Sequence, residues 1–171
     1  DSDESRGLGD VYKRQETWLK PMSRCLLDPT GLLSFCTRVI IIRKGSKEGK
    51  AMETFLETVC LQIWLLAAMM ADAAAETLCI IRLFDTENIN LATMCQHINA
   101  FLDRITWLFF ERGCFKIQGH VAWIMIWLKS RHFVLVDGIA KTIGGEAISE
   151  TIIDGCLQHL QSWVRLAKST L

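Results

Sequence analysis

The longest uncharged stretch, Thr58–Ala71, constrains the fold more than any other feature. It reads TVCLQIWLLAAMMA, and Glu57 and Asp72 bracket it. As a helix it would be roughly 21 Å long. A bilayer core requires about 30 Å, or about 20 apolar residues. We therefore predict that the stretch is a buried central helix, and that this helix extends from about Ser46 to Phe84.

Hydrophobic periodicity predicts two more long helices. The first extends from Asn90 to Arg112, and we expect Gly113 to end it in the C′ position. Its apolar residues follow the three-and-four spacing of one helix face, and they are Leu91, Met94, Cys95, Ile98, Leu102, Ile105, Leu108 and Phe109. The second is Glu146–Lys168, which we expect to bury Ile148, Ile152, Cys156, Leu160, Trp163 and Ala167.

The segment from Cys114 to about Val134 is strongly apolar and is interpreted as a further helix. Val134–Asp137 is a candidate for extended chain before Gly138. The run Val39–Ile42 is β-branched and would suit a strand, but the sequence offers no second convincing strand to pair with it. We therefore interpret this run as helix as well.

The first part of the fold is expected to be irregular. Residues 16–27 resemble a short helix that Pro21 should break, and Asp28–Gly31 has the sequence of a turn, with proline second. Short loops between helices favour antiparallel neighbours. The predicted fold class is therefore all-α, an antiparallel bundle of about four main helices after an irregular N-terminal segment.

Residues 1–15 differ from the rest of the chain because they are rich in charges and poor in large apolar residues. Within them, SRGLGDVYKRQ resembles a translated sequencing adapter of the kind found at the ends of reading frames in metagenomic assemblies. This resemblance is to no protein family and implies no function. We expect residues 1–15 to be a disordered tail, the natural start to be missing, and residues 16–171 to form a single helical domain, whole or part of a larger protein.

Charge and cysteine content restrict the partners and the compartment. The formal net charge is zero at pH 7, so no basic surface for nucleic acid is indicated. Half of the residues are hydrophobic, and this composition without net charge favours a protein partner or self-association. The seven cysteines are an odd number and none is in a CxxC spacing, which argues against a disulfide framework or zinc site. We expect a reducing, cytoplasmic environment.

Searches for known catalytic and cofactor motifs give no match. A ferritin-like diiron site requires Glu-x-x-His, but Glu111 is followed three residues later by Cys114, and Glu150 by Ile153. The pair Gly144-Gly145 belongs to no nucleotide-binding loop, and no G-x-S-x-G is present. We therefore predict no cofactor and no metal, and the catalytic residues, if any, are unknown.

A few residue pairs have the types needed for metal binding or nucleophilic catalysis. Cys95/His97 and Cys114/His120 contain soft metal ligands, and Cys156/His159 contains a thiol and a base. Cys95 and His97 are two apart and point to different sides of a helix, whereas Cys156 and His159 are three apart and form the most plausible nucleophile pair. The preferred interpretation is nevertheless core thiols beside boundary or surface histidines. Trp123 and Trp127, one turn apart, are interpreted as core or interface aromatics before a membrane-interface belt.

Three functions remain open after these searches. The favoured one is a helical protein–protein interaction or structural module. An alternative is a membrane-associated protein into which Thr58–Ala71 and Ile117–Leu128 insert. The third is a helical enzyme whose site forms only in three dimensions, which a buried pocket with two or more of His97, His120, His132, Glu111 and Asp103 would favour.

Overall fold

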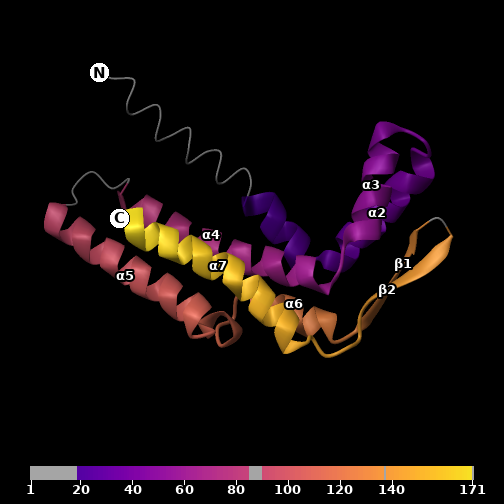
Figure 1. Cartoon of the computed structure of the whole chain (residues 1–171). Coiled ribbons are helices and arrows are strands. Elements are labelled where there is room, and N and C mark those ends of the chain that lie inside the picture. The colour runs from indigo at the N-terminus through magenta and orange to yellow at the C-terminus, as the bar shows by residue number, and fades with distance from the viewer. Residues whose placement is uncertain (1–18, 85–89, 137, 171) are drawn as a thin grey trace, which may run out of the picture.

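Helices make up most of the structure, a computed structural model that describes residues 19–84, 90–136 and 138–170 (Figure 1). This confirms the predicted all-α class. In chain order the elements are the helix Leu19–Leu27, α2 (Pro29–Ile42), α3 (Lys47–Thr58), α4 (Leu61–Phe84), α5 (Leu91–Phe110), the 3₁₀ helix η1 (Gly113–Phe115), α6 (His120–Leu128), β1 (Arg131–Val136), β2 (Ile139–Gly144) and α7 (Glu150–Thr170).

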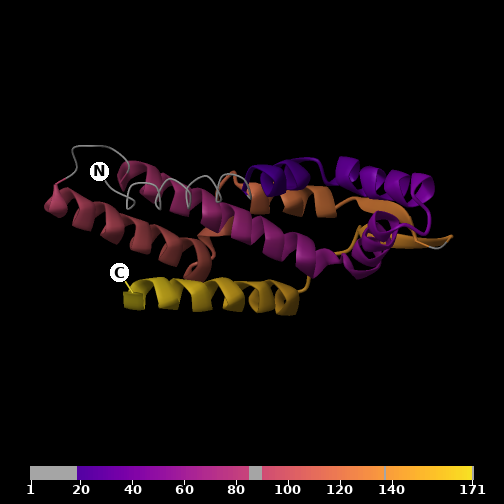
Figure 2. The ribbon, with the colours of Figure 1, turned by 90° about the horizontal axis from the view of Figure 1, so that it is seen from above.

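The predicted antiparallel bundle is formed mainly by α4, α5 and α7, which pack against one another. Both ribbon views show α5 running opposite to α4 and α7 (Figures 1 and 2). The shorter α6 packs against α4 on the side away from α5 and α7. Arg112 also forms ion pairs with Glu150 and Asp154, which link the end of α5 to the first turns of α7.

A second group of elements projects from the N-terminal end of α4 (Figure 1). It consists of α2, α3 and the hairpin β1–β2, and we call it the arm (residues 29–58 and 131–144). Within the arm α2 packs on α3, and β1 lies against both. The strands are antiparallel, with Arg131 opposite Gly144 and Val136 opposite Ile139.

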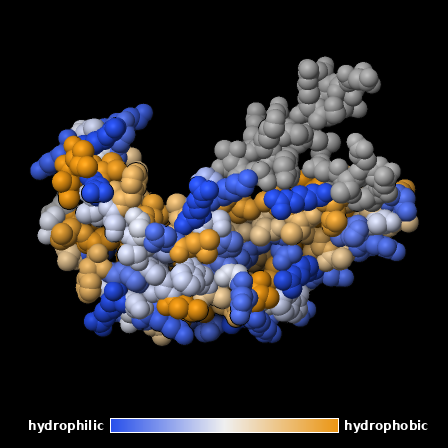
Figure 3. All heavy atoms as spheres, turned by 180° about the vertical axis from the view of Figure 1, so that it is seen from behind, coloured by the Kyte–Doolittle hydropathy of each residue, from blue (hydrophilic) through white to orange (hydrophobic). Residues whose placement is uncertain are grey.

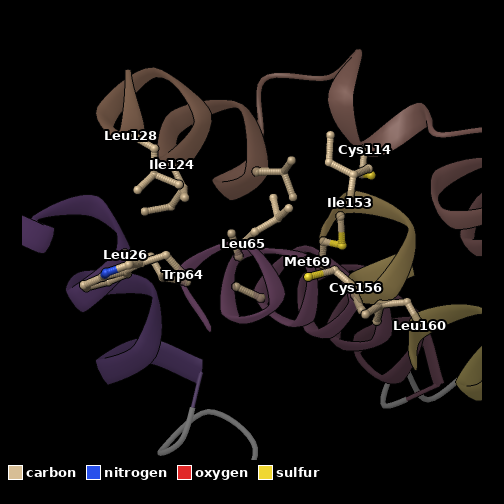
Figure 4. Packing of buried hydrophobic residues seen from close by; sticks show 14 of the residues in the cluster. Leu26, Trp64, Leu65, Met69, Cys114, Ile124, Leu128, Ile153, Cys156 and Leu160 are labelled. Atoms are coloured by element: carbon tan, nitrogen blue, oxygen red, sulfur yellow. The ribbon is translucent and has the colours of Figure 1, made fainter. Parts of the chain in front are cut away.

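The core lies between α4 and its neighbours. Figure 4 shows Leu65 and Met69 of α4 among side chains of α6 and α7. The fully buried residues that meet there include Leu65, Ala68, Met69, Ile105, Leu108, Phe109, Cys114, Val121, Ile124, Cys156 and Val164. Most of these are aliphatic, so the bundle is stabilised chiefly by removal of apolar surface from water.

The prediction of one central helix from Ser46 to Phe84 is wrong. A helix does begin after Ser46, whose side chain caps it by accepting a hydrogen bond from the Gly49 N–H. That helix ends at Thr58, however, and Val59 is extended with φ −62° and ψ 127°. The break separates α3 from α4, which allows α3 to pack on α2.

The stretch Thr58–Ala71 is also less buried than predicted. Trp64, Leu65, Ala68, Met69 and Ala71 are buried, but Ile63 and Met70 are 42% and 41% exposed. Neighbouring elements cover only part of α4. This part of the helix is therefore apolar on all sides but buried on only some of them.

The predicted helix from Cys114 to about Val134 is wrong as well. The segment divides into η1, α6 and β1. Val134–Val136 are extended, as expected, but they belong to a strand that begins at Arg131 and pairs with β2, the strand that sequence reasoning missed. Gly138 has φ +78°, a conformation that suits a hairpin turn. Asp137 lies outside the described residues.

Two predictions near the start of the fold need correction. Residues Leu19–Leu27 are helical, so Pro21 does not break this segment. Asp28–Gly31 is the beginning of α2: the Asp28 carboxylate accepts a hydrogen bond from the Gly31 N–H at 2.9 Å, and Pro29 takes the first helical position, which it suits. The helical interpretation of Val39–Ile42 is confirmed.

The two periodic helices match the prediction in part. In α5, Ile105, Leu108 and Phe109 are buried, but Leu91 is 76% exposed because the apolar stripe continues beyond the packed half of the helix. In α7 the predicted Cys156 and Leu160 are buried. The other buried positions are Ile153, Leu157 and Val164, and the helix begins at Glu150, after Ile148.

The end of α5 also differs from the prediction. Arg112, with φ 57°, is the left-handed residue, and Gly113 begins η1. Glycine is required at position 113 for space, because an added Cβ would lie 2.5 Å from the Trp107 ring.

We predict opposite effects for two alanine substitutions at helix-associated glycines. Gly113→Ala should destabilise the protein by about 1–3 kcal/mol, because the methyl group overlaps Trp107. Gly155→Ala, within α7 with no atom near the new Cβ, should stabilise it by about 1 kcal/mol. Urea denaturation of both variants tests this, and a destabilising Gly155→Ala would show that the α7 packing is wrong.

Candidate functional site

Among the residues that the structure describes, Asp72 is the charged residue that is buried, with 5% exposure. It lies on α4 where that helix meets the beginning of α6. Its Oδ1 accepts the backbone N–H of His120 at 2.8 Å, and its Oδ2 accepts that of Val121 at 3.1 Å. N–H groups of a first helical turn have no partner within their own helix. The carboxylate of Asp72 therefore caps α6 from a neighbouring helix, at the end where the helix dipole favours negative charge.

Gly119 makes this contact possible. It is the N-cap residue of α6, and it forms no side-chain capping hydrogen bond. A Cβ at position 119 would lie 2.7–2.9 Å from the carboxyl atoms of Asp72. Glycine therefore allows the carboxylate to approach the backbone of α6.

His120 extends the contact to a third helix. Its Nδ1 is 2.8 Å from Oδ1 of Asp72, and its Nε2 is 2.7 Å from the hydroxyl oxygen of Ser23. In the tautomer with a proton on Nδ1, the ring donates a hydrogen bond to the Asp72 carboxylate, and its Nε2 accepts a hydrogen bond from the Ser23 hydroxyl. We call Ser23, His120 and Asp72 the polar chain; it joins the helix Leu19–Leu27, α6 and α4.

The polar chain has the order of groups found in serine hydrolases: hydroxyl, imidazole and carboxylate. Three observations favour a structural role instead. The carboxylate is already engaged by two backbone N–H groups. Neither of the two large cavities found among the described residues is lined by Ser23. The serine also lies within a helix, and not on the exposed strand-to-helix turn of an α/β-hydrolase.

The cysteine–histidine pairs do not form nucleophilic sites. Burial, with the negative charge of Asp72 as a second cause, raises the pKa of Cys114 to about 12. Burial also raises the pKa of Cys156, whose thiol lies 3.6 Å from the Gln62 carbonyl oxygen, whereas His159 is exposed. Both cysteines are therefore thiols at neutral pH and act as core residues.

The other candidate residues are dispersed. The interpretation of Cys95 as a core thiol is wrong, because Cys95 is exposed on α5, where His97 is partly exposed. The described residues contain no group of three or more potential metal ligands. Glu111 and Asp103 are exposed. Neither large cavity in the described ranges contains two of the five residues proposed for an enzyme site.

The two tryptophans of α6 connect the bundle to the segments before it. The Trp123 indole N–H donates to the Leu27 carbonyl at 3.1 Å, and that of Trp127 donates to the Thr30 hydroxyl at 3.0 Å. Trp127 also stacks on the His132 ring, with centroids 3.9 Å apart and an interplanar angle of 12°. Trp123 is 45% exposed and Trp127 is partly buried, so neither is a core residue; both contact the segments before the bundle.

A groove of about 940 Å³ lies in the arm between α2 and β1. We call it the α2/β1 groove. Its lining residues are Thr30, Leu33, Ser34, Thr37, Arg38, Ile41, Ile42, Arg131, His132, Phe133, Val134, Leu135 and Ala140. The other large cavity, of about 590 Å³, is lined mainly by apolar residues of α4 and α7.

Sequence reasoning missed Ser23, Asp72 and the groove as candidate sites. Asp72 gave the one usable signal, because it is an acidic residue directly after the long uncharged stretch of α4. Comparisons with known proteins add no assignment: no family model matches the chain, and no curated protein and no solved structure matches it.

We predict that Asp72→Ala destabilises the protein by about 2–4 kcal/mol, because it removes the charged cap and leaves two backbone N–H groups of α6 unpaired. Ser23→Ala should cost about 1 kcal/mol, since it removes one partly exposed hydrogen bond. Thermal or urea unfolding measures both. Asp103→Ala, at an exposed position on α5, is the control and should change stability by less than about 0.5 kcal/mol.

Proposed function

We propose that this chain is a helical protein-interaction module that binds a protein partner through its arm. The observation that carries the proposal is the group of large apolar side chains on the arm that are more than half exposed, namely Phe35, Ile41, Ile42, Phe133, Leu135 and Ile139. Figure 3 shows apolar residues exposed at this end of the molecule beside hydrophilic ones.

Scattered apolar residues are normal on protein surfaces, but groups of them mark interaction sites. The exposed residues of the arm come from two segments far apart in the sequence, α2 and the hairpin, which the fold brings together. The bundle behind them contains a continuous core. A rigid core that presents an apolar, partly basic arm is suited to binding another protein.

Membrane association has weaker support. By length and composition α4 is the one unbent helix in the described ranges that could cross a bilayer, and the segments Leu19–Leu27 and Pro29–Ile42 qualify only as a pair bent by 99°. Half of the relevant window of α4 is buried inside the protein. The packing of α4 against α5, α6 and α7 therefore accounts for much of its apolar character.

We predict that the full chain, without a partner, binds a hydrophobic dye and associates as its concentration rises. Ile41→Ser and Phe133→Ser should each lower dye fluorescence and shift the mass measured by light scattering toward that of the monomer, because both remove exposed apolar surface from the arm. Leu91→Ser is the matched control, since Leu91 is more exposed than either but lies on α5.

A monomeric wild-type protein that binds no dye would contradict the interaction proposal. A protein that stays in solution only with detergent would support the membrane alternative. A Leu91→Ser variant with the same effect as the arm variants would show that association does not depend on the arm.

A second candidate function, acyl transfer at Ser23, rests on the distance of 2.7 Å between its hydroxyl and His120 Nε2. If the polar chain is catalytic, a fluorophosphonate probe will label the wild-type protein and label neither Ser23→Ala nor a folded His120→Gln variant. We expect no labelling, since Ser23 lines neither large cavity. Ser34→Ala, on α2, controls for labelling of other exposed serines.

A further inference from the structure

We propose that the α2/β1 groove binds an extended acidic peptide, which adds to the free edge of β1 as a third strand. This inference rests on the proposed interaction function and names the class of partner. It depends on three properties of the groove: a strand edge on one side, a helix face on the other, and a lining whose charged residues are all basic.

The strand contributes its edge to the groove. Five consecutive residues, Arg131–Leu135, line it. Successive side chains of a strand point to opposite faces, so one face would contribute only every second residue. Consecutive lining residues indicate that the groove follows the edge of β1, and Ala140 of β2, which pairs with Leu135, shows that it also reaches over one face of the hairpin. Among the described strands β1 pairs only with β2, so its other edge has no strand partner.

The helix contributes one complete face. Its lining residues recur at the three-and-four spacing over the whole of α2, and they are Thr30, Leu33, Ser34, Thr37, Arg38, Ile41 and Ile42. Leu33 of α2 and Val134 of β1 are buried, and Ile41, Ile42, Phe133 and Leu135 are exposed. The groove thus combines a buried apolar base with open apolar walls.

The dimensions suit a short peptide. Five residues of strand extend roughly 17 Å, and α2 with its fourteen residues is roughly 21 Å long. The groove volume of about 940 Å³ is at the upper end of the range of small-ligand pockets. A peptide of about six residues in extended form would occupy the strand edge from end to end.

The charges define the chemistry of the peptide. Arg38 and Arg131 are the charged residues of the lining, both are exposed, and neither forms an ion pair with any residue that the structure describes. The ring of His132 is occupied by its stacking on Trp127. A peptide with acidic side chains alternating with apolar ones would place carboxylates near the arginines and apolar groups against Ile41, Phe133 or their neighbours.

A second copy of this chain does not fit the groove as well. Its described strands, RHFVLV and IAKTIG, contain no acidic residue. Pairing of β1 with a strand of another copy would bring lysine or arginine toward Arg38 and Arg131. Like charges oppose such a contact, so a different protein with an acidic segment is the better occupant.

The test measures fluorescence anisotropy of a labelled peptide of about six residues, in which glutamate and valine alternate, as the full-length protein is added. We expect saturable binding. Replacing the glutamates by lysine should weaken it about tenfold or more, because the arginines then face like charges. N-methylation of alternate peptide bonds, on the register that faces β1, should weaken it to a similar degree, because strand addition requires backbone hydrogen bonds.

Protein variants locate the binding site. Arg38→Ala and Arg131→Ala should each weaken binding several-fold while the far-UV circular dichroism is unchanged, since both side chains are exposed. Lys44→Ala and Lys129→Ala, exposed cations outside the groove lining, are the matched controls. Equal weakening by all four would reveal attraction to general positive charge and would overturn the groove proposal.

Two further outcomes would overturn the inference. In the first, the peptide shows no saturable binding. In the second, the peptide binds, but N-methylation does not change its affinity. Either result leaves the interaction proposal standing if the Ile41→Ser and Phe133→Ser variants still lose dye binding. If those variants keep dye binding and the peptide also fails to bind, both proposals fail.

Discussion

The contact between the Asp72 carboxylate and the beginning of α6 is the interaction on which the rest of the arrangement depends. A buried carboxylate is costly unless hydrogen bonds compensate for its lost hydration, and here two backbone N–H groups and the His120 ring do so. The contact holds α6 against α4. Through the hydrogen bond between His120 and Ser23, it also connects the helix Leu19–Leu27 to both. Because β1 follows α6 after two residues, the same contact determines where the hairpin begins and thus where the arm projects.

Sequence reasoning predicted what local pattern and capping determine, and failed where distant residues decide. The predicted helix starts at about Ser46 and at Asn90 are confirmed: both side chains are N-caps, and Asn90 accepts the Thr93 N–H at 2.9 Å. The break at Val59 has no glycine or proline to mark it, and its consequence, the packing of α3 on α2, involves residues distant from it. The hairpin did carry a local signal, Asp137-Gly138 between two apolar runs. It was missed because the segment from Cys114 to about Val134 was interpreted as one helix, although the polar residues Lys129–His132 separate its two apolar runs.

The candidate site was beyond sequence reasoning for a different reason. Ser23 and His120 are 97 positions apart, and Asp72 and His120 are 48 apart. A single sequence gives no information about such pairs, since no spacing rule connects them. The same holds for the α2/β1 groove, whose two walls lie about a hundred residues apart along the chain. For α2 the sequence predicted helix at Val39–Ile42, but it could not show which element the helix faces.

The arm combines a marginal sheet with a stable support. A hairpin of two strands has little stability alone, and three strands or packing on a helix are needed. Here Lys141 of β2 donates hydrogen bonds to the carbonyl oxygens of Leu56 and Glu57, at the C-terminal end of α3 where a cation is favoured. This holds the hairpin on α3 while the edge of β1 toward α2 stays unpaired. A peptide strand in the groove would supply the third strand that the hairpin lacks, so binding and ordering of the arm would stabilise each other. Only a partner that pairs with β1 would stabilise the hairpin in this way. This favours an extended peptide over a helix as the occupant.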